Sequence, residues 1–513
     1  MKIRLPVLFI ALLLNINALA QAPTAGLNAY VHKAMAQWQV PGLAVAIVKD
    51  GKLVFARGYG VRELGKPGKV NADTLFTIGS VSKQFTVAAL GTLVSAGKLT
   101  WDAPVTEYLK NFQLGSAYVT RNITLSDLLT HRSGYCDPLW MWYTSDDTAA
   151  NVIERLRYQT PDYGFRAHFC YNNTMYLAAS QFIPAITGES WNEYVTQHLF
   201  TPLGMTRTDT TEAAVEAATN AALPHAKMDN RVVVIKRYWA NNMDVFAPVG
   251  GINSSVNDMS RWLEMLLADG NYAGKTVVDP AVITTMETPH MIIPAHTWIG
   301  DWMRTQTPGS HFYAYGFGFM LQDYGPYKVV WHAGDINGFA TAMALVPSQH
   351  LGVIALSNLD QNRAPEGVVF HVLQSYLGLP YFDVSTAMYD YRQKENAKDK
   401  AALQKLAATR QKGARAPRPL SAYAGIYRDD FYGTAQVTEA QGHLVLRLGN
   451  PRFTGDLVPW HDNTFRVTWR YHYYGKAYIT FDLDAYGNPD RLNFALQPLH
   501  YERVEKASAA ASQ

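Results

Sequence analysis

The stretch that decides the fold is Thr77-Ile-Gly-Ser-Val-Ser-Lys-Gln-Phe85. Ser80 stands where a helix is predicted to begin, and Lys83 follows three residues later, so both side chains are expected on one helix face. A hydroxyl at a helix N-terminus lies where the macrodipole favours a developing negative charge, which suits a nucleophile. The same residues also fit a serine cap and a solvent-facing lysine, and Ser95-Ala-Gly-Lys98 repeats the pattern. The rest of the chain must separate the two interpretations.

The N-terminal segment is typical of a cleavable export signal. Lys2 and Arg4 precede an apolar run over residues 5–14, and Ala18-Leu-Ala20 provides a cleavage site with small residues. We expect residues 1–20 to be a signal peptide that is cut after Ala20, and the mature protein to be periplasmic or secreted. The residue directly after this cut is not a cysteine, and no later apolar run reaches membrane-spanning length. We therefore expect no stable membrane anchor.

Length and charge narrow the function classes. A chain of 513 residues with 48% hydrophobic residues predicts two or three domains with large cores. Lys and Arg (45) nearly balance Asp and Glu (42), and the net charge of +3 gives no electrostatic reason to expect nucleic acid. We therefore expect a small-molecule or peptide substrate, and the oligomeric state stays open.

Strand patterns lie near both ends of residues 21–383, which we predict to form the first domain. The apolar runs Gly42–Val48 and Leu53–Ala56 flank Asp50-Gly51, a strong hairpin signal. Further strands are predicted over residues 316–321, 328–332, 340–346 and 352–357. Residues 100–245 between them are typical of helices and loops. This order predicts an α+β fold with a mixed or antiparallel sheet and a helical insert.

The C-terminal part has a different character. Residues 384–420 predict a charged helix and a linker. Over residues 421–505 short alternating runs recur between turn signals, which predicts a small all-β domain, an antiparallel barrel of lipocalin-like type. Residues 506–513 are expected to be a disordered tail.

Several routes to hydrolysis have no counterpart in the sequence. It contains no G-x-S-x-G elbow, no H-E-x-x-H motif and no H-x-H cluster. Serine chemistry centred on Ser80 remains, without a metal or other cofactor.

Three short motifs occur in the chain in the same order as three sequence boxes of a known superfamily. Ser80-Val-Ser-Lys83, Tyr171-Asn-Asn173 and His332-Ala-Gly334 resemble the S-x-x-K, Y-x-N and K/H-x-G boxes of the serine β-lactamase and penicillin-binding-protein superfamily, closest to its class C-like serine hydrolases. Residues 129–134 and 250–259 are also similar to stretches of that family, and the likeness covers about residues 25 to 380. The resemblance implies a β-lactamase-like sheet with a helical insert.

The resemblance also implies a role for each matching residue. Ser80 would be the acylated nucleophile. Lys83 would lower the barrier to proton transfer as an ammonium beside the hydroxyl or, if deprotonated by desolvation, act as the base. Tyr171 would be a second proton shuttle, its phenol pKa lowered by Lys83. Asn173 would bind the substrate or Lys83. The backbone N–H groups of Ser80 and Asp335 would form the oxyanion hole.

The third box departs from the lactamase form. K-T-G supplies an ammonium and a hydroxyl for a substrate carboxylate. His332 instead offers an imidazole that is neutral about half the time or more near pH 7, and Ala333 offers a methyl group. His332 and Gly334 remain substrate-binding candidates, in a box similar to that of D-aminopeptidases and esterase-like relatives. We therefore expect hydrolysis of a small amide, peptide or ester through a Ser80 acyl-enzyme. The alternative is a β-lactamase or a penicillin-binding or peptidoglycan-binding protein with little turnover.

Two features stay open at this point. Cys136 and Cys170 each flank a loop of the candidate site and fit either one disulfide or two buried thiols. The aromatic stretches Trp140-Met-Trp-Tyr143 and Tyr313-Ala-Tyr315 could line an apolar substrate cleft or pack in the core.

Overall fold

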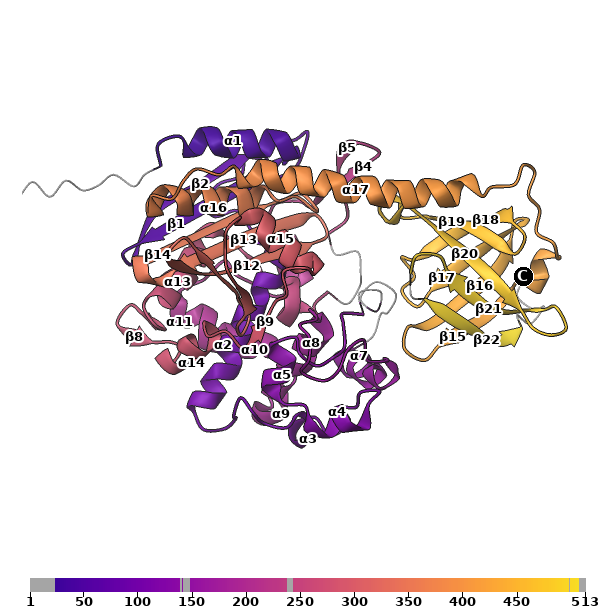
Figure 1. The fold of residues 1–513 in the computed structure, drawn as a ribbon, viewed down its shortest axis with the longest axis horizontal. Helices are drawn as coiled ribbons and strands as arrows, with labels where there is room; N and C mark the ends of the chain where they lie inside the picture. The colour runs from indigo at the N-terminus through magenta and orange to yellow at the C-terminus, as the bar shows by residue number, and fades with distance from the viewer. Residues whose placement is uncertain (1–23, 139–140, 142–147, 238–242, 498, 507–513) are drawn as a thin grey trace, which may run out of the picture.

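The chain folds into an N-terminal domain and a C-terminal barrel joined by one long helix, α17 (Val384–Ala408) (Figure 1). The computed structural model describes residues 24–138, 141, 148–237, 243–497 and 499–506. The predicted signal peptide and residues 507–513 of the predicted tail lie outside the described residues. Within the described ranges, no helix combines the length and the apolar character needed to cross a bilayer.

The N-terminal domain is built on an eight-stranded sheet in the order β2-β1-β14-β13-β12-β11-β10-β9, in which every neighbouring pair is antiparallel. Strands from the two ends of the domain pair directly, as Val45 with Ala355. The predicted hairpin is confirmed, with Asp50 (φ 52°) and Gly51 (φ 71°) both left-handed as a two-residue turn requires. The strands are β1 Gly42–Lys49, β2 Lys52–Gly60, β9 Met291–Ile292, β10 Tyr313–Tyr315, β11 Met320–Tyr324, β12 Tyr327–Ile336, β13 Phe339–Val346 and β14 Leu351–Ser357.

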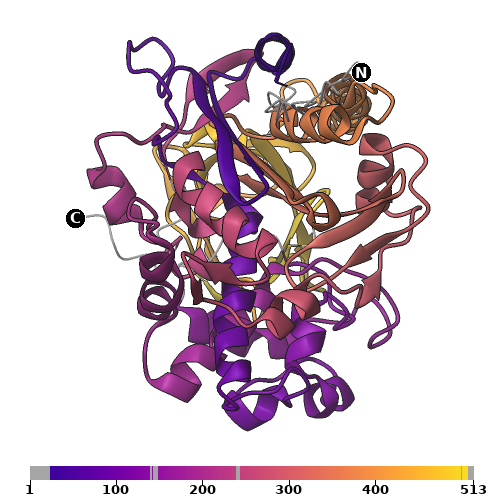
Figure 2. The same cartoon turned by 90° about the vertical axis from the view of Figure 1, so that its left-hand side faces the viewer.

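Helices cover both faces of this sheet (Figure 2). Leu43, Val45 and Ile47 of β1 belong to the core that includes α1 (Leu27–Trp38) and α16 (Ala364–Leu377). The alternate residues Ala44, Ala46 and Val48 belong to the core on the other face, with α2 (Ser82–Ser95) and α13 (Val256–Leu267). Because both faces are covered, the strand is apolar without interruption rather than alternating.

The strand predicted over residues 316–321 is wrong at its start. Gly316 to Phe319 form a tight turn, closed by the Gly316 N–H donating to the Phe319 carbonyl at 2.8 Å. Gly318 takes φ 76°, and a Cβ at Gly316 would lie 2.2 Å from the Met286 carbonyl oxygen. The two glycines therefore serve the turn, and strand β11 begins only at Met320.

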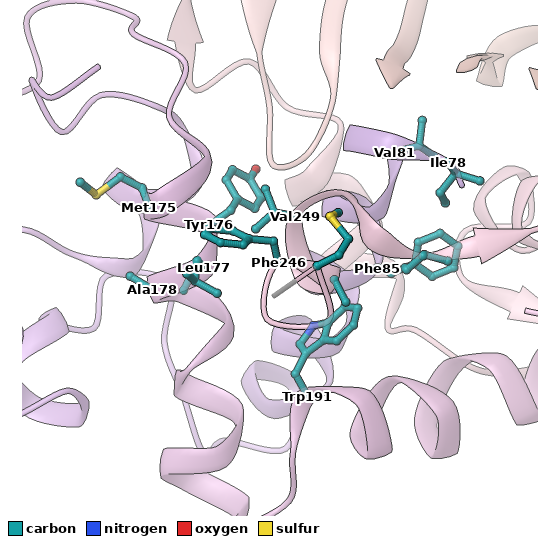
Figure 3. Close-up of a cluster of buried hydrophobic side chains, with 14 of the residues drawn as sticks. Ile78, Val81, Phe85, Met175, Tyr176, Leu177, Ala178, Trp191, Phe246 and Val249 are labelled. Atoms are coloured by element: carbon teal, nitrogen blue, oxygen red, sulfur yellow. The ribbon is translucent and has the colours of Figure 1, made fainter. Parts of the chain in front are cut away.

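The predicted helical insert surrounds α2, which is buried along most of its length. Phe85 of α2 stacks on Trp262 with ring centroids 4.0 Å apart, and Figure 3 shows Phe85, Tyr176 and Val249 in the same buried cluster. The remaining α-helices described in the N-terminal domain are α3 Val105–Tyr108, α4 Ala117–Asn122, α5 Leu125–Leu129, α7 Ala149–Arg155, α8 Asn173–Ser180, α9 Phe182–Thr187, α10 Trp191–Val195, α11 Thr201–Leu203, α12 Glu212–Ala217, α14 Pro280–Met286 and α15 Trp298–Gln306. Short strand pairs are β3 Phe76–Thr77 with β6 Asn253–Ser254, β4 His225–Met228 with β5 Arg231–Val234, and β7 Asn271–Tyr272 with β8 Lys275–Thr276.

The C-terminal domain is a closed antiparallel barrel, as predicted. Each strand pairs with the next along the chain, and β15 closes the ring with β22. Aromatic rings fill the interior, among them Tyr423, Phe465 and Phe481, whose centroids lie 5.0–5.6 Å apart. The strands are β15 Gly425–Asp429, β16 Gly433–Ala440, β17 His443–Leu448, β18 Thr454–His461, β19 Thr464–Trp469, β20 Lys476–Leu483, β21 Pro489–Phe494 and β22 His500–Lys506.

Candidate active site

Ser80 and Lys83 face each other, although Ser80 lies just before the α-helix rather than in it. Gly79–Val81 form a 3-10 turn that leads directly into α2. The Lys83 Nζ lies 3.0 Å from the Ser80 Oγ, and the Lys83 side chain is completely buried, while Ser80 remains partly accessible. Burial holds the pKa of Lys83 well below its usual value, and the Asp137 carboxylate opposes this shift only in part. A neutral amine in this position is able to accept the proton of the serine hydroxyl.

A glycine-rich turn, η4 (Ala247–Gly251), holds the first turns of α2 in place. Lys83 Nζ donates to the Val249 carbonyl at 3.0 Å, and Thr86 Oγ1 donates to the Pro248 carbonyl at 2.6 Å. The Ile252 N–H donates in turn to Ser82 Oγ at 3.2 Å. Because the Val249 carbonyl binds the amine and the other two bonds hold the helix, Lys83 has little freedom to leave the hydroxyl.

The end of strand β12 runs against the turn that carries Ser80. Gly79 has φ 56°, and a Cβ there would lie 2.8 Å from the Asp335 backbone nitrogen. A Cβ at Gly334 would lie 2.1 Å from the Ile78 carbonyl oxygen. Both positions therefore need glycine, and the close approach places the backbones of Ser80 and Asp335 on touching segments. This is the arrangement that an oxyanion hole built from those two N–H groups requires.

Tyr171 also lies close to the Lys83 amine. Its ring centroid is 5.0 Å from Lys83 Nζ, and its phenol oxygen is buried without a hydrogen-bond partner among the described residues. Burial raises the pKa of Tyr171 well above its usual value, and the neighbouring Ser80 hydroxyl offsets this only in part. The expectation that Lys83 lowers this pKa is therefore wrong, because desolvation of the phenolate is the largest influence on it. Tyr171 is a protonated phenol at neutral pH and is able to donate a proton.

Asn173 binds Asp137, which sequence reasoning had missed. Its Nδ2 donates to Asp137 Oδ2 at 2.6 Å, and its backbone N–H donates to Asp137 Oδ1 at 3.1 Å. The expected bond from Asn173 to Lys83 is not formed, since the hydrogen bonds of Lys83 go to Ser80 and Val249. The available signal was position: Asp137 directly follows Cys136, in a loop already assigned to the site.

His332 is buried beneath the site and neutral. Its Nδ1 lies 2.5 Å from the Ala333 carbonyl oxygen, so Nδ1 carries the proton, and Nε2 accepts from the Tyr315 hydroxyl at 3.1 Å. Burial lowers the pKa of His332 to about 3, and a proton on Lys83 would add to this shift. The imidazole, which was expected to be largely neutral near pH 7, is therefore neutral, and both ring nitrogens are occupied.

The aromatic stretches divide between core and undescribed regions. Tyr313 and Tyr315 are buried, which favours the core-packing interpretation for that stretch. Trp140, Trp142 and Tyr143 lie outside the described residues.

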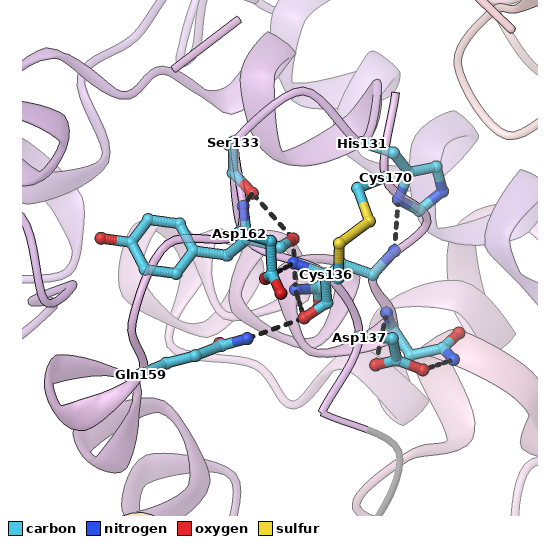
Figure 4. The surroundings of a disulfide bond; sticks show 10 residues. His131, Ser133, Cys136, Asp137, Gln159, Asp162 and Cys170 are labelled. Atoms are coloured by element: carbon cyan, nitrogen blue, oxygen red, sulfur yellow. Dashed lines mark hydrogen bonds between the residues drawn. A yellow bond between two sulfur atoms is a disulfide. The ribbon is translucent and has the colours of Figure 1, made fainter. Parts of the chain in front are cut away.

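A disulfide joins the two loops that flank Tyr171. Cys136 and Cys170 are bonded, which decides between the two alternatives left open by the sequence (Figure 4). The Cys136 carbonyl also accepts from Gln159 Nε2 at 2.7 Å and from Asn172 Nδ2 at 3.1 Å. The bridge thereby ties the residue before Tyr171 to the segment that carries Asp137.

Removing the bridge should loosen the Tyr171 loop. We expect the double change Cys136→Ser and Cys170→Ser to lower the free energy of unfolding by about 2–4 kcal/mol, because the loop between the cysteines is no longer closed. Urea unfolding of the non-reduced protein measures this. Ser133→Ala, which removes the side-chain bonds to the N–H and the carbonyl of Tyr135 in the same loop but leaves the bridge, is the control. Equal stabilities of the double variant and the wild type would contradict the expectation.

Comparisons with known proteins agree with this geometry. Residues 27–376 match the family model described as Beta-lactamase, and residues 409–506 match a domain of unknown function (DUF3471). The unguisins hydrolase ungD of Aspergillus violaceofuscus is 27% identical over 462 residues, which cover 83% of this chain and 78% of that protein. The unguisins hydrolase ungD' of Aspergillus campestris is 28% identical over 361 residues, covering 68% and 64%. Protein flp of Staphylococcus aureus strain MW2 is 25% identical over 364 residues, covering 70% and 67%.

Solved structures share the fold at lower identity. An octameric penicillin-binding protein homologue from Pyrococcus abyssi superposes with a TM-score of 0.59 at 21% identity, over 93% of this chain and 99% of that one. SurE superposes with a TM-score of 0.56 at 18% identity, over 94% and 99%. The family model spans the sheet, α2 and all three motifs, and relatives matched over most of the chain are named hydrolases. The chain therefore belongs to the beta-lactamase family, and the protein is a serine hydrolase.

Proposed function

We propose that the protein is an exported serine hydrolase that cleaves a small amide, peptide or ester through an acyl-enzyme on Ser80. The observation that carries this proposal is the 3.0 Å contact between Ser80 Oγ and the Nζ of the completely buried Lys83. A neutral Lys83 takes the hydroxyl proton while Oγ attacks the substrate carbonyl. The negative charge on the carbonyl oxygen is stabilised by the N–H groups of Ser80 and Asp335.

Tyr171 completes the proton transfers. As the bond to the leaving group breaks, the protonated phenol gives its proton to the leaving nitrogen or oxygen. The Lys83 ammonium then returns a proton to the Tyr171 phenolate. This step leaves the acyl-enzyme with Lys83 neutral and Tyr171 protonated again. Water next attacks the ester of Ser80, and the same groups carry the protons in the reverse sense.

The third box, His332-Ala-Gly334, supports a substrate that has an uncharged group at the place where lactamases bind a substrate carboxylate. His332 is neutral and bonded through both ring nitrogens, and Ala333 adds only a methyl group. Neither side chain supplies the positive charge that a substrate carboxylate would need.

The barrel supports a small substrate, because it contacts the N-terminal domain. The Tyr473 hydroxyl donates to Asp360 Oδ2 at 2.6 Å. Burial raises the pKa of Asp360 to about 6, and the charge of Asp335 adds to this shift. The Tyr473–Asp360 hydrogen bond supports a restricted approach to Ser80.

The disulfide supports export, since such bonds persist in oxidising compartments. With cleavage after Ala20, the mature chain begins at Gln21 in the periplasm or outside the cell.

Labelling tests the nucleophile. A fluorophosphonate should label the wild-type protein, and Ser80→Ala should abolish the label, because the probe forms a covalent bond only with an activated serine. Ser82→Ala is the matched control, since its hydroxyl lies only two residues further along the chain but accepts from the Ile252 N–H. Label retained by Ser80→Ala would remove Ser80 from this role.

The pH profile tests the base. We expect kcat/KM for an ester to fall as the pH is lowered through the depressed pKa of Lys83, since the protonated amine cannot accept the serine proton. Lys83→Arg should lower kcat/KM by about 10²- to 10⁴-fold. His332→Gln should keep the acid limb, because the His332 pKa of about 3 lies below the working range. An acid limb that disappears with His332→Gln would contradict this assignment.

A substrate panel tests the reaction class. We expect a short-chain nitrophenyl ester and a D-alanyl anilide to be hydrolysed with higher kcat/KM than a chromogenic cephalosporin, whose carboxylate finds no charged partner in the third box. Turnover is followed by absorbance at saturating and limiting substrate. A burst without a steady-state phase on all three compounds would instead favour a penicillin-binding protein with little turnover.

A further inference from the structure

His131 occupies a backbone position that histidine rarely takes. It follows α5 and its C-cap Thr130, and it adopts φ 57°. This place after a helix is usually filled by glycine or asparagine, because other side chains crowd the backbone there. The His131 side chain is also completely buried. A strained, buried and polar residue next to a reactive site is a reason to look for a role.

The contacts of His131 bracket Tyr171. The His131 carbonyl accepts from the Cys170 N–H at 2.8 Å, and the His131 Nδ1 accepts from the Asn172 N–H at 3.0 Å. These are the residues immediately before and after Tyr171. The imidazole also lies against the Tyr171 ring, with centroids 4.3 Å apart and planes inclined by 33°. Figure 4 shows the His131 ring directed at the loop that carries Cys170.

The left-handed conformation makes this double contact possible. With φ 57°, His131 presents both its carbonyl and its Nδ1 to N–H groups on the segment of Cys170 and Asn172. Because Nδ1 accepts, the ring is the neutral tautomer with its proton on Nε2. Burial keeps the pKa of His131 well below its usual value, and a proton on Lys83 or His332 would lower it further.

The remaining ring nitrogen points into an aromatic enclosure. The Nε2 of His131 is buried and has no hydrogen-bond partner among the described residues. The rings of Tyr315 and Tyr176 lie 4.7 and 5.1 Å from the imidazole centroid. These rings hold the imidazole on its other sides, so its orientation toward Tyr171 is fixed.

We propose that His131 is the positioning residue of Tyr171, fixing both the backbone and the ring of the proton donor relative to Lys83 and Ser80. It touches no reacting atom and acts only through Tyr171. The inference rests on the proposed function, in which Tyr171 transfers a proton to the leaving group.

Two variants that both tolerate the left-handed backbone conformation separate positioning from simple core packing. Asparagine and glycine both tolerate the left-handed conformation, and Asn Oδ1 occupies nearly the place of His Nδ1. We expect His131→Gly to lower kcat on the nitrophenyl ester by about 10²-fold with little change in KM, because displacement of a catalytic group acts mainly on the chemical step. His131→Asn should recover most of this loss, since the acceptor for the Asn172 N–H is restored.

A readout independent of turnover follows Tyr171 directly. With ¹³C-labelled tyrosine, the NMR signal assigned by Tyr171→Phe should shift or broaden in His131→Gly and return toward the wild-type position in His131→Asn. His225→Asn is the control, because His225 is also buried but accepts from the Leu64 N–H, outside the Tyr171 loop. It should lower thermal stability and leave both the Tyr171 signal and kcat unchanged.

The outcomes distinguish the two proposals. A Tyr171 signal that is the same in His131→Gly and the wild type would overturn the positioning role, and so would equal kcat values in the two proteins. A wild-type protein without Ser80-dependent turnover, whose Tyr171 signal still follows the residue at position 131, would refute the proposed function and support the positioning.

Discussion

The structure around the site depends on the burial of one amine. An ammonium taken out of water without a close counter-ion is strongly disfavoured, so it lowers its pKa and loses its proton. Lys83 is in this situation, with a carbonyl on one side and the Ser80 hydroxyl on the other, while the Asp137 carboxylate acts only through its field. The neutral amine beside a hydroxyl is the chemical basis for every step proposed above.

The rest of the N-terminal domain keeps that amine dry and fixed. Helix α2 is buried on nearly all sides, with Phe85 stacked on Trp262, so its first turn cannot drift. The glycine-rich turn η4 closes over Lys83, and the end of β12 comes so near that Gly79 and Gly334 leave no room for a side chain. The same desolvation that lowers the pKa of Lys83 raises that of Tyr171 and lowers that of His332. One physical cause thus separates a base, an acid and a neutral ring within a few ångströms.

Two devices hold the Tyr171 side of the site. The disulfide between Cys136 and Cys170 ties the loops together covalently, and His131 binds the backbone on either side of the tyrosine. The barrel contacts the N-terminal domain through the hydrogen bond from Tyr473 to Asp360. We therefore expect substrate choice to depend on the second domain as well as on the third box, and the proposed chemistry to depend on the first domain.

The sequence by itself determined the α+β domain, the closed barrel and the order of the three motifs, because apolar periodicity and turn residues act locally. Asp50-Gly51 and the alternating runs after residue 421 are signals of this kind. Only the tertiary structure decided the disulfide, the Asp137 partner of Asn173 and the direction of the Tyr171 pKa. It also showed residues 316–319 to be a turn rather than a strand. These properties depend on burial and on contacts between residues far apart in the chain, and no local pattern of residues encodes how much water a side chain keeps.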